Sequence, residues 1–329
     1  MMSVICFDLE GPLATQDNAY ELMKLFPEGG RIFEVISRYD DLLTLSARFD
    51  YEPGDTLALI APFLVYHGIK EHDISTLARK ATLTAGAIGL IHRLSTQGWK
   101  IFCISTSYEQ YAKHIARRLG IFAQNIACTF FPLDKFSKEL SKGDFSCAEA
   151  VEKDILDRHP IDDDWIKKRL DRFYWKELPK TSLGLLLEQV KPVGGQRKVE
   201  ALRHFATAQK QPFPNWVVVG DSITDFKMLQ TVDQASGLAI AFNANEYALP
   251  YATIGLASTH LDDLRPVLET WEKGGRPAVE KLVRQKEKAG GNGDRGYWHW
   301  LAGAKNTAAP LEIHKRIRRV VREEAAKLG

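Results

Sequence analysis

Two apolar runs that each end in acidic residues constrain this chain more than any other feature. The first is VICFDLEGPL at residues 4–13, and the second is WVVVGDSITD at residues 216–225. Runs of β-branched and aromatic residues without alternation are typical of strands buried on both faces of a parallel sheet. The carboxyl ends of such strands meet at one edge of the sheet, and ligands bind outside that edge. We therefore expect acidic side chains from both runs to lie close together.

The acids that end these two runs are Asp8, Glu10, Asp221 and Asp225. Crowded carboxylates repel one another unless a cation lies among them, and oxygen ligands of this kind suit Mg²⁺. Mg²⁺ commonly keeps a substrate phosphate among its ligands as well. The pattern predicts a magnesium site for phosphoryl transfer, with Asp8 beside the ion and Asp221 as a ligand. Asp225 is expected to be a further ligand or to support Asp221, although an acid near a helix N-terminus is also favourable by itself.

Four segments, in this order, resemble the motifs of the haloacid dehalogenase superfamily of phosphohydrolases. They are DLEGPL at 8–13, IST at 104–106, Lys198, and GDSITD at 220–225. The spacing from Lys198 to Asp221 resembles the phosphoserine phosphatase branch, and the resemblance covers about residues 1–260. It implies a Rossmann-like core with a helical cap, bound Mg²⁺ and an aspartyl-phosphate intermediate. DLEGPL, ISTSYEQY and IAFNANEYAL also resemble a poorly characterised group, some members of which are labelled as energy-converting hydrogenase subunit R. That label implies no particular chemistry, but it leaves open a non-catalytic subunit of a larger complex as an alternative. Intact Asp8, Lys198 and Asp221 argue against that alternative, because a binding module does not need them.

Asp8 is the expected nucleophile, because a carboxylate at a strand end beside Mg²⁺ can attack phosphorus. An Asp that caps the following turn is the alternative. Glu10 stands where phosphatases of the superfamily usually carry an Asp that protonates the leaving group and then activates water. Glu can do the same work, but it is one methylene longer. The resemblance also implies that the backbone carbonyl of Glu10 is a metal ligand in either case. A DLEG start also resembles a phosphoserine phosphatase relative that passes its phosphate to homoserine, so transfer to an alcohol acceptor stays open.

Ser105 and Thr106 follow the predicted strand at residues 99–104 and are expected to precede a helix. Their hydroxyls and the helix N–H groups would bind phosphate, and a plain helix cap is the alternative. Lys198 is expected to neutralise phosphate and nucleophile together, in preference to Lys191, which precedes a proline. Two asparagines, Asn243 and Asn245, follow the predicted strand at residues 238–242. Substrate contact and turn formation fit them equally well.

Alternating strand and helix patterns predict an α/β fold with a doubly wound parallel sheet. We assign residues 1–16 and 95–260 to this core and residues 17–94, which show helical spacing only, to a cap. Residues 134–190 form a charged helical accessory segment, predicted to be too polar for a core. Because a cap closes such a site against macromolecules, the expected substrate is a small phosphorylated metabolite.

A C-terminal helical extension is expected over residues 261–329. It contains a long surface helix at 264–288, a glycine-rich loop at 289–296 and an amphipathic helix at 311–328. The last helix carries basic residues that could bind an anionic or protein partner, but a solvated face is the preferred interpretation. These residues are Lys315, Arg316, Arg318, Arg319 and Arg322.

Composition excludes several other classes. Of the 329 residues, 45% are hydrophobic and 26% charged, which is ordinary for a globular protein. A formal charge of +2 predicts no nucleic-acid or membrane partner, and the lack of a signal peptide pattern predicts a cytoplasmic protein. The four cysteines and nine histidines lack the spacing of zinc ligands, so no zinc is expected.

Overall fold

The computed structural model describes residues 3–46, 51–140, 142–158, 160 and 162–322. Its centre is one seven-stranded sheet in the order β3-β2-β1-β4-β5-β6-β7. Six strands are parallel, and only β7 runs antiparallel, against β6. The strands are β1 Val4–Phe7, β2 Lys100–Tyr108, β3 Ile126–Thr129, β4 Trp216–Gly220, β5 Leu238–Phe242, β6 Ile254–Ala257 and β7 Tyr297–Trp300. The predicted doubly wound α/β fold is confirmed.

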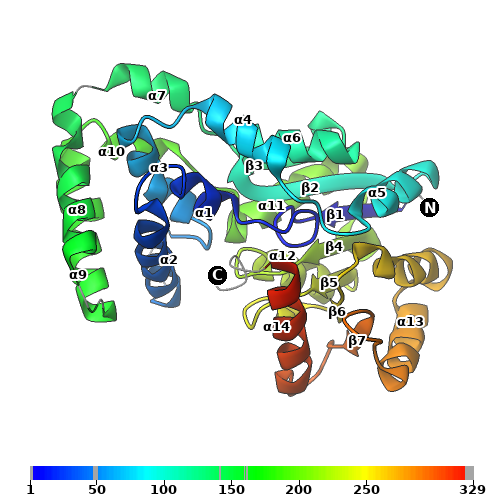
Figure 1. Cartoon of the computed structure of the whole chain (residues 1–329). Helices are drawn as coiled ribbons and strands as arrows, with labels where there is room; N and C mark the ends of the chain where they lie inside the picture. The colour runs from blue at the N-terminus through cyan, green and yellow to red at the C-terminus, as the bar shows by residue number, and fades with distance from the viewer. Residues whose placement is uncertain (1–2, 47–50, 141, 159, 161, 323–329) are drawn as a thin grey trace.

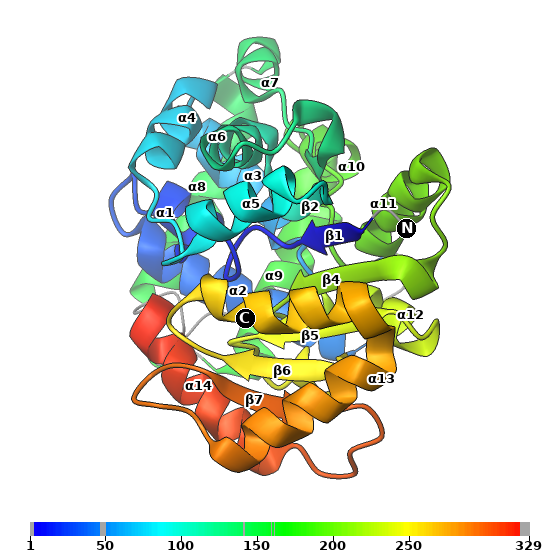
Figure 2. The ribbon, with the colours of Figure 1, turned by 90° about the vertical axis from the view of Figure 1, so that its right-hand side faces the viewer.

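Helices cover both faces of this sheet, which explains the uninterrupted apolar runs. On β1, Ile5 and Phe7 face one core with α5 Ala87–Thr96, α6 Glu109–Leu119 and α13 Arg265–Ala289. Val4 and Cys6 alternate with them and face the second core, beneath α11 Gly195–Gln209 and α12 Phe226–Gln234. Figure 2 shows α5 and α13 on the near face of the sheet. Each fully buried valine or isoleucine of the central strands contributes about 1.5–3 kcal/mol by leaving water.

A group of helices stands beside the carboxyl edge of the sheet (Figure 1). It includes α1 Asn18–Met23, α2 Gly29–Leu45 and α3 Thr56–Tyr66, which come from the first insertion. It also includes α8 Ser146–Asp157, α9 Asp163–Arg172 and α10 Gly184–Gln189, which pack against α2 and α3. The remaining helices of the region, α4 Glu71–Lys80 and α7 Leu133–Glu139, pack against α6 and α3 respectively. Two insertions that are far apart in sequence therefore build this helical layer together.

The structure corrects two expectations about secondary and tertiary structure. Residues 134–190 were expected to be too polar for a core, yet their apolar stripe is buried in the main hydrophobic core. The buried side chains are Ala148, Val151, Ile155, Ile166, Leu170 and Phe173. The expectation was wrong because a narrow apolar stripe is sufficient when α2 and α3 supply the opposite surface. Strand β7, in the expected C-terminal helical extension, was not predicted; its Trp298 packs in the core.

The C-terminal extension folds back onto the sheet. Helix α13 kinks at Gly275, and β7 then adds an antiparallel edge to β6. The last helix, α14 Ala308–Arg322, packs against β6 and ends beside the carboxyl edge of the central strands (Figure 1). Among the described residues, no helix is both long and apolar enough to cross a bilayer.

Candidate active site

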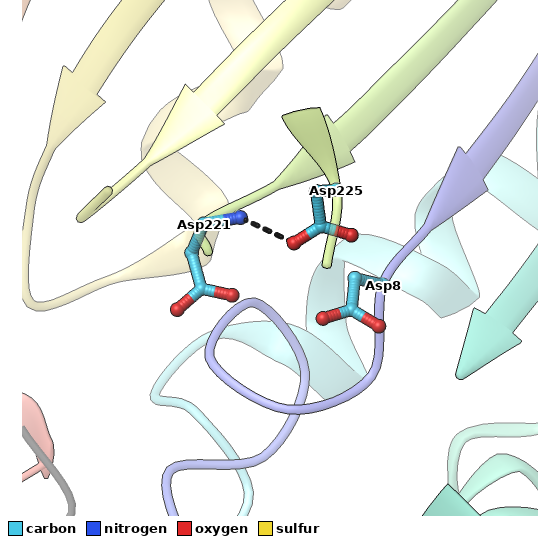
Figure 3. A group of neighbouring side chains, drawn as sticks. All are labelled: Asp8, Asp221 and Asp225. Carbon is cyan, nitrogen blue, oxygen red and sulfur yellow. Dashed lines mark hydrogen bonds between the residues drawn. The ribbon is translucent and has the colours of Figure 1, made fainter. Parts of the chain in front are cut away.

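The acidic residues of the two apolar runs meet at the carboxyl edge of the sheet. Strands β1 and β4 are neighbours with Phe7 opposite Val219, and the N–H of Asp8 donates to the carbonyl of Val219 at 2.8 Å. This register places Asp8 beside the loop that carries Asp221 and Asp225. One carboxylate oxygen of each residue lies within 4.8 Å of the others, and all three side chains are buried (Figure 3).

Lys198 is the cation at the centre of this cluster. Its fully buried Nζ donates to Oδ1 of Asp8 and to Oδ1 of Asp225, each at 2.7 Å. Burial lowers the pKa of Lys198, but the two carboxylates outweigh burial and raise it, so the side chain stays charged. Lys198 lies in the first turn of α11, whereas the alternative, Lys191, is exposed and precedes the helix. The geometry thus brings Lys198, not Lys191, to the acids.

The carboxylate of Asp225 is occupied by donors of the protein itself. Its Oδ1 accepts from Lys198, and its Oδ2 accepts the backbone N–H of Asp221 at 3.0 Å (Figure 3). The same Oδ2 accepts the backbone N–H of Ser222 at 3.1 Å. These bonds hold the loop between β4 and α12 in place. Asp225 therefore positions Asp221 and Lys198.

The two carboxylate oxygens of Asp221 differ in their hydrogen bonding. Its Oδ2 accepts hydrogen bonds from Arg318 and Arg322 of α14. Its Oδ1 is buried and has no hydrogen-bond partner among the described residues. Gly11 packs directly against this carboxylate: a Cβ there would lie 2.4 Å from it, and φ is +100°. Only glycine fits at such a position.

The carboxyl group of Glu10 is held at the edge of the same cavity. Its Oε1 accepts the hydroxyl of Ser107 and the backbone N–H of Asn18, the latter at 3.1 Å. Burial, reinforced by the charge of Asp17, raises the pKa of Glu10 to about 7. A carboxyl group with such a pKa can donate and accept a proton near neutral pH.

Burial, followed by the charge of Asp225, raises the pKa of Asp8 well above its ordinary value, while Lys198 acts against both. In the structure Asp8 accepts from the charged Lys198, which favours its ionised form. Its other carboxylate oxygen has no donor among the described residues. The side chain also lines the cavity. A carboxyl group that lines the cavity and whose ionised form is favoured by a neighbouring cation has the position that a nucleophile requires.

Ser105 and Thr106 take different positions from those expected. Strand β2 continues to Tyr108 with an irregularity after Ile104, and α6 begins only at Glu109. The N-terminal N–H groups of α6 are thus not next to Ser105, and the expected arrangement was wrong. Thr106 lines the cavity and donates to the carbonyl of Val193. Ser105 is buried beneath it, and its Oγ accepts the N–H of Ser107.

The side chains of the two asparagines after β5 form hydrogen bonds to the backbone of nearby loops. Asn243 bonds through both side-chain atoms to the backbone of Ser258, at 2.8 Å each. Oδ1 of Asn245 accepts the N–H groups of Tyr247 and Ala248. These contacts favour turn formation over substrate contact, since neither asparagine lines the cavity beside Asp8.

Sequence reasoning missed Arg318 and Arg322. The basic face of the last helix was expected to be solvated, but these two side chains are only 3% and 8% exposed and line the cavity beside Asp8. His314 precedes them at the same spacing, and its Nδ1 accepts the N–H of Ala244. The stripe at 314, 318 and 322 is the available signal, but a helical pattern alone does not show what that stripe faces. Of the other basic residues, Lys315 and Arg316 pair with surface acids, and Arg319 is exposed.

The donor set fits a divalent cation. Carboxylate oxygens of Asp8 and Asp221 converge, and Oδ1 of Asp221 is a buried acceptor without a partner. Hard oxygen donors in such an arrangement suit Mg²⁺. Asp8 and Asp221 would hold the ion, with the Glu10 carbonyl as the third protein ligand expected from the sequence.

Comparison with known proteins supports this fold assignment. No family model and no curated protein matches the chain. Among solved structures, phosphoserine phosphatases have the same fold: one phospho-aspartyl intermediate analogue gives a TM-score of 0.52 at 16% identity, over 80% of this chain and 98% of that one. A probable phosphoserine phosphatase from Vibrio cholerae gives 0.51 at 18%, over 86% of this chain and 67% of that one. At these identities the likeness shows a shared fold, which is the fold that the sequence resemblance implies.

A much stronger similarity links the chain to a gene product from Archaeoglobus fulgidus. The TM-score is 0.82 at 29% identity, and the match covers 100% of this chain and 99% of that one. Because this match covers the whole chain, it includes the region of α13, β7 and α14.

Proposed function

We propose that this chain is a magnesium-dependent phosphohydrolase that acts on a small phosphomonoester through an aspartyl-phosphate. The observation that carries the proposal is the convergence of Asp8, Asp221 and Asp225 around the buried Lys198. A structural ion pair alone would not require a third buried carboxylate with an unpartnered oxygen. The phosphoserine phosphatase fold of the solved structures supports the same chemistry.

In the first half-reaction a carboxylate oxygen of Asp8 attacks phosphorus, and the bond from phosphorus to the ester oxygen breaks. Glu10, whose pKa of about 7 leaves it partly protonated, gives its proton to the departing oxygen. Lys198 and the hydroxyl of Thr106 lie beside the place where the phosphate must bind. When bound, Mg²⁺ would offset the negative charge of the phosphate.

In the second half-reaction water replaces the alcohol. Glu10 removes a proton from that water, the water oxygen attacks phosphorus, and the bond to Asp8 breaks to release phosphate and restore the carboxylate. An alcohol acceptor in place of water would give phosphotransfer. We keep this second candidate function because Glu10 is longer than the usual Asp and is tied to Ser107 and the N–H of Asn18.

The cavity supports a small substrate. It lies between the sheet edge and α2, which contributes Phe33, Ser37 and Asp40 to its wall. A folded macromolecule could not reach Asp8 through such a space without displacement of α2.

A screen of phosphorylated metabolites for phosphate release, with Mg²⁺ and with a chelator, tests the proposal. We expect Mg²⁺-dependent release from at least one small phosphomonoester, and loss of release in the Asp8→Asn variant. The same screen with added alcohols separates hydrolysis from transfer. Equal release with the chelator, or from the Asp8→Asn variant, would show that this site does not carry the activity.

A further inference from the structure

The C-terminal helix brings two positive charges into the cluster of acids. Arg318 and Arg322 both donate to Oδ2 of Asp221, the carboxylate that the proposed function assigns to Mg²⁺. Arg318 also donates to the carbonyl of Asn243 at 3.3 Å, and Arg322 to the carbonyl of Thr15 at 3.2 Å. Because guanidinium groups stay charged even when buried, both remain cations here.

Helix α14 is held against the rest of the protein by contacts on several of its sides. Buried His314 accepts the N–H of Ala244, and Ile317 is fully buried. On the outer side, Arg316 pairs with Asp294 at 2.6 Å and stacks over Tyr297. Lys315 adds an ion pair with Glu246. These contacts on several sides of α14 hold Arg318 and Arg322 beside Asp221.

The formal charges of the six buried groups at the centre of the site, called here the inner cluster, cancel. Its three carboxylates, Asp8, Asp221 and Asp225, face the three buried cations Lys198, Arg318 and Arg322. Glu10 adds at most one negative charge. Asp17 at the start of α1 also lines the cavity and acts on Glu10, but it is partly exposed, so solvent weakens its effect on the buried cluster. A divalent cation alone would then leave excess positive charge in a buried site, which is unfavourable.

We propose that Arg318 and Arg322 make cation binding conditional on an anion: a divalent cation binds tightly only together with the phosphate dianion. This inference rests on the proposed function and deepens it. The guanidinium groups occupy Oδ2 of Asp221 and leave the unpartnered Oδ1 for the ion. The two negative charges of a phosphate offset the two positive charges that the ion adds. By linkage, the cation must strengthen phosphate binding by the same factor.

Calorimetric titration of Mg²⁺ into the full chain, with and without inorganic phosphate, tests the coupling without turnover. We expect phosphate to tighten Mg²⁺ binding by about 10-fold or more, within the usual range of such couplings. The Arg318→Met and Arg322→Met variants should each bind Mg²⁺ more tightly than the wild type without phosphate, and should show a smaller effect of phosphate. Arg319→Met removes an exposed charge from the same helix and is the matched control.

If phosphate does not change the Mg²⁺ affinity of the wild type, the inference is wrong. This comparison needs no variant. A folded Arg318→Met or Arg322→Met chain that binds Mg²⁺ no more tightly than the wild type would also overturn the inference. Asp221→Ala separates this failure from failure of the proposed function. If Asp221→Ala abolishes Mg²⁺ binding while the arginine variants behave as the wild type, the metal site stands and only the coupling is wrong. If Asp221→Ala leaves Mg²⁺ binding intact, the metal assignment itself fails.

Discussion

Lys198 donates a hydrogen bond of 2.7 Å to Asp8, although 190 residues separate the two in the chain. The same Nζ lies 2.7 Å from Asp225, so one buried cation joins the proposed nucleophile to the residue that holds the Asp221 loop. The positions of Asp8 and of the Asp221 loop both depend on this one side chain.

Lys198→Met should therefore destabilise the fold as well as stop turnover. Removal of one partner from a buried ionic cluster costs about 3–5 kcal/mol, because Asp8 and Asp225 are left facing each other. Urea unfolding measures the loss. Lys191→Met, which removes an exposed lysine just before α11, is the control and should leave the free energy of unfolding nearly unchanged. A loss of less than about 1 kcal/mol in Lys198→Met would mean that the cluster is not held by this cation.

Asp8→Asn should lower turnover by at least about 1,000-fold, since the amide cannot attack phosphorus. The fold should persist because Asn is nearly isosteric and can still accept from Lys198. Circular dichroism checks the fold, and beryllofluoride should bind at Asp8 in the wild type but not in the variant. Substantial residual turnover would refute Asp8 as the nucleophile.

Glu10→Asp should raise the ratio of hydrolysis to transfer. The shorter side chain moves the carboxyl group by about one bond length, and a misplacement of roughly 1 Å can change a rate by about 100-fold. An alcohol acceptor brings binding contacts of its own, so it should depend less on that placement than water does. Partitioning of the intermediate between water and an added alcohol is the quantity to measure. Glu34→Asp, on the exposed face of α2, is the control. An unchanged partition ratio would remove the main support for phosphotransfer.

Asp40→Asn should change how stability depends on pH. Burial raises the pKa of Asp40 in the cavity wall to about 7, above an unfolded value of about 3.9. Between these values the folded chain binds more protons than the unfolded chain, so stability falls as pH rises. Asparagine does not ionise, so the variant does not lose stability in this way. The free energy of unfolding of Asp40→Asn, relative to the wild type, should therefore increase by up to about 4 kcal/mol from pH 4 to pH 8.

Urea unfolding of Asp40→Asn and wild type at the two pH values measures this difference. Asp164→Asn, at an exposed position on α9, should give the same difference from the wild type at both. If Asp40→Asn also behaves in that way, the pKa of Asp40 is not raised in the folded protein.

Much of the sheet and of the acidic cluster could be predicted from local patterns. Uninterrupted apolar runs identify strands that are covered on both faces, and parallel pairing brings their carboxyl ends to one edge. Asp8 and Asp221 therefore had to meet once β1 and β4 were neighbours. The choice of Lys198 over Lys191 also followed from its position in a helix start, and the structure places only Lys198 among the acids.

The helices that surround the site were less predictable. A polar composition concealed the apolar stripe of α8 and α9, because burial of that stripe depends on α2 and α3, which lie far away in the sequence. Strand β7 was missed because a short edge strand is stabilised by its neighbour β6 more than by its own four residues. Ser105 and Thr106 lie within an extended, irregular β2, and no local signal marks where that strand ends.

What the sequence by itself determined is the α/β sheet and the acids at its carboxyl edge, because strand burial and side-chain type follow from neighbouring residues. Only the tertiary structure decided that Arg318 and Arg322 enter the site. Helical periodicity shows which residues share a face, but not what that face covers. The partner of Arg318 is Asp221, which lies 97 residues away, and the contact arises from the path of α13 and β7 around the sheet. A charge that appears solvated in the sequence can therefore be a buried counter-ion when a distant carboxylate needs one.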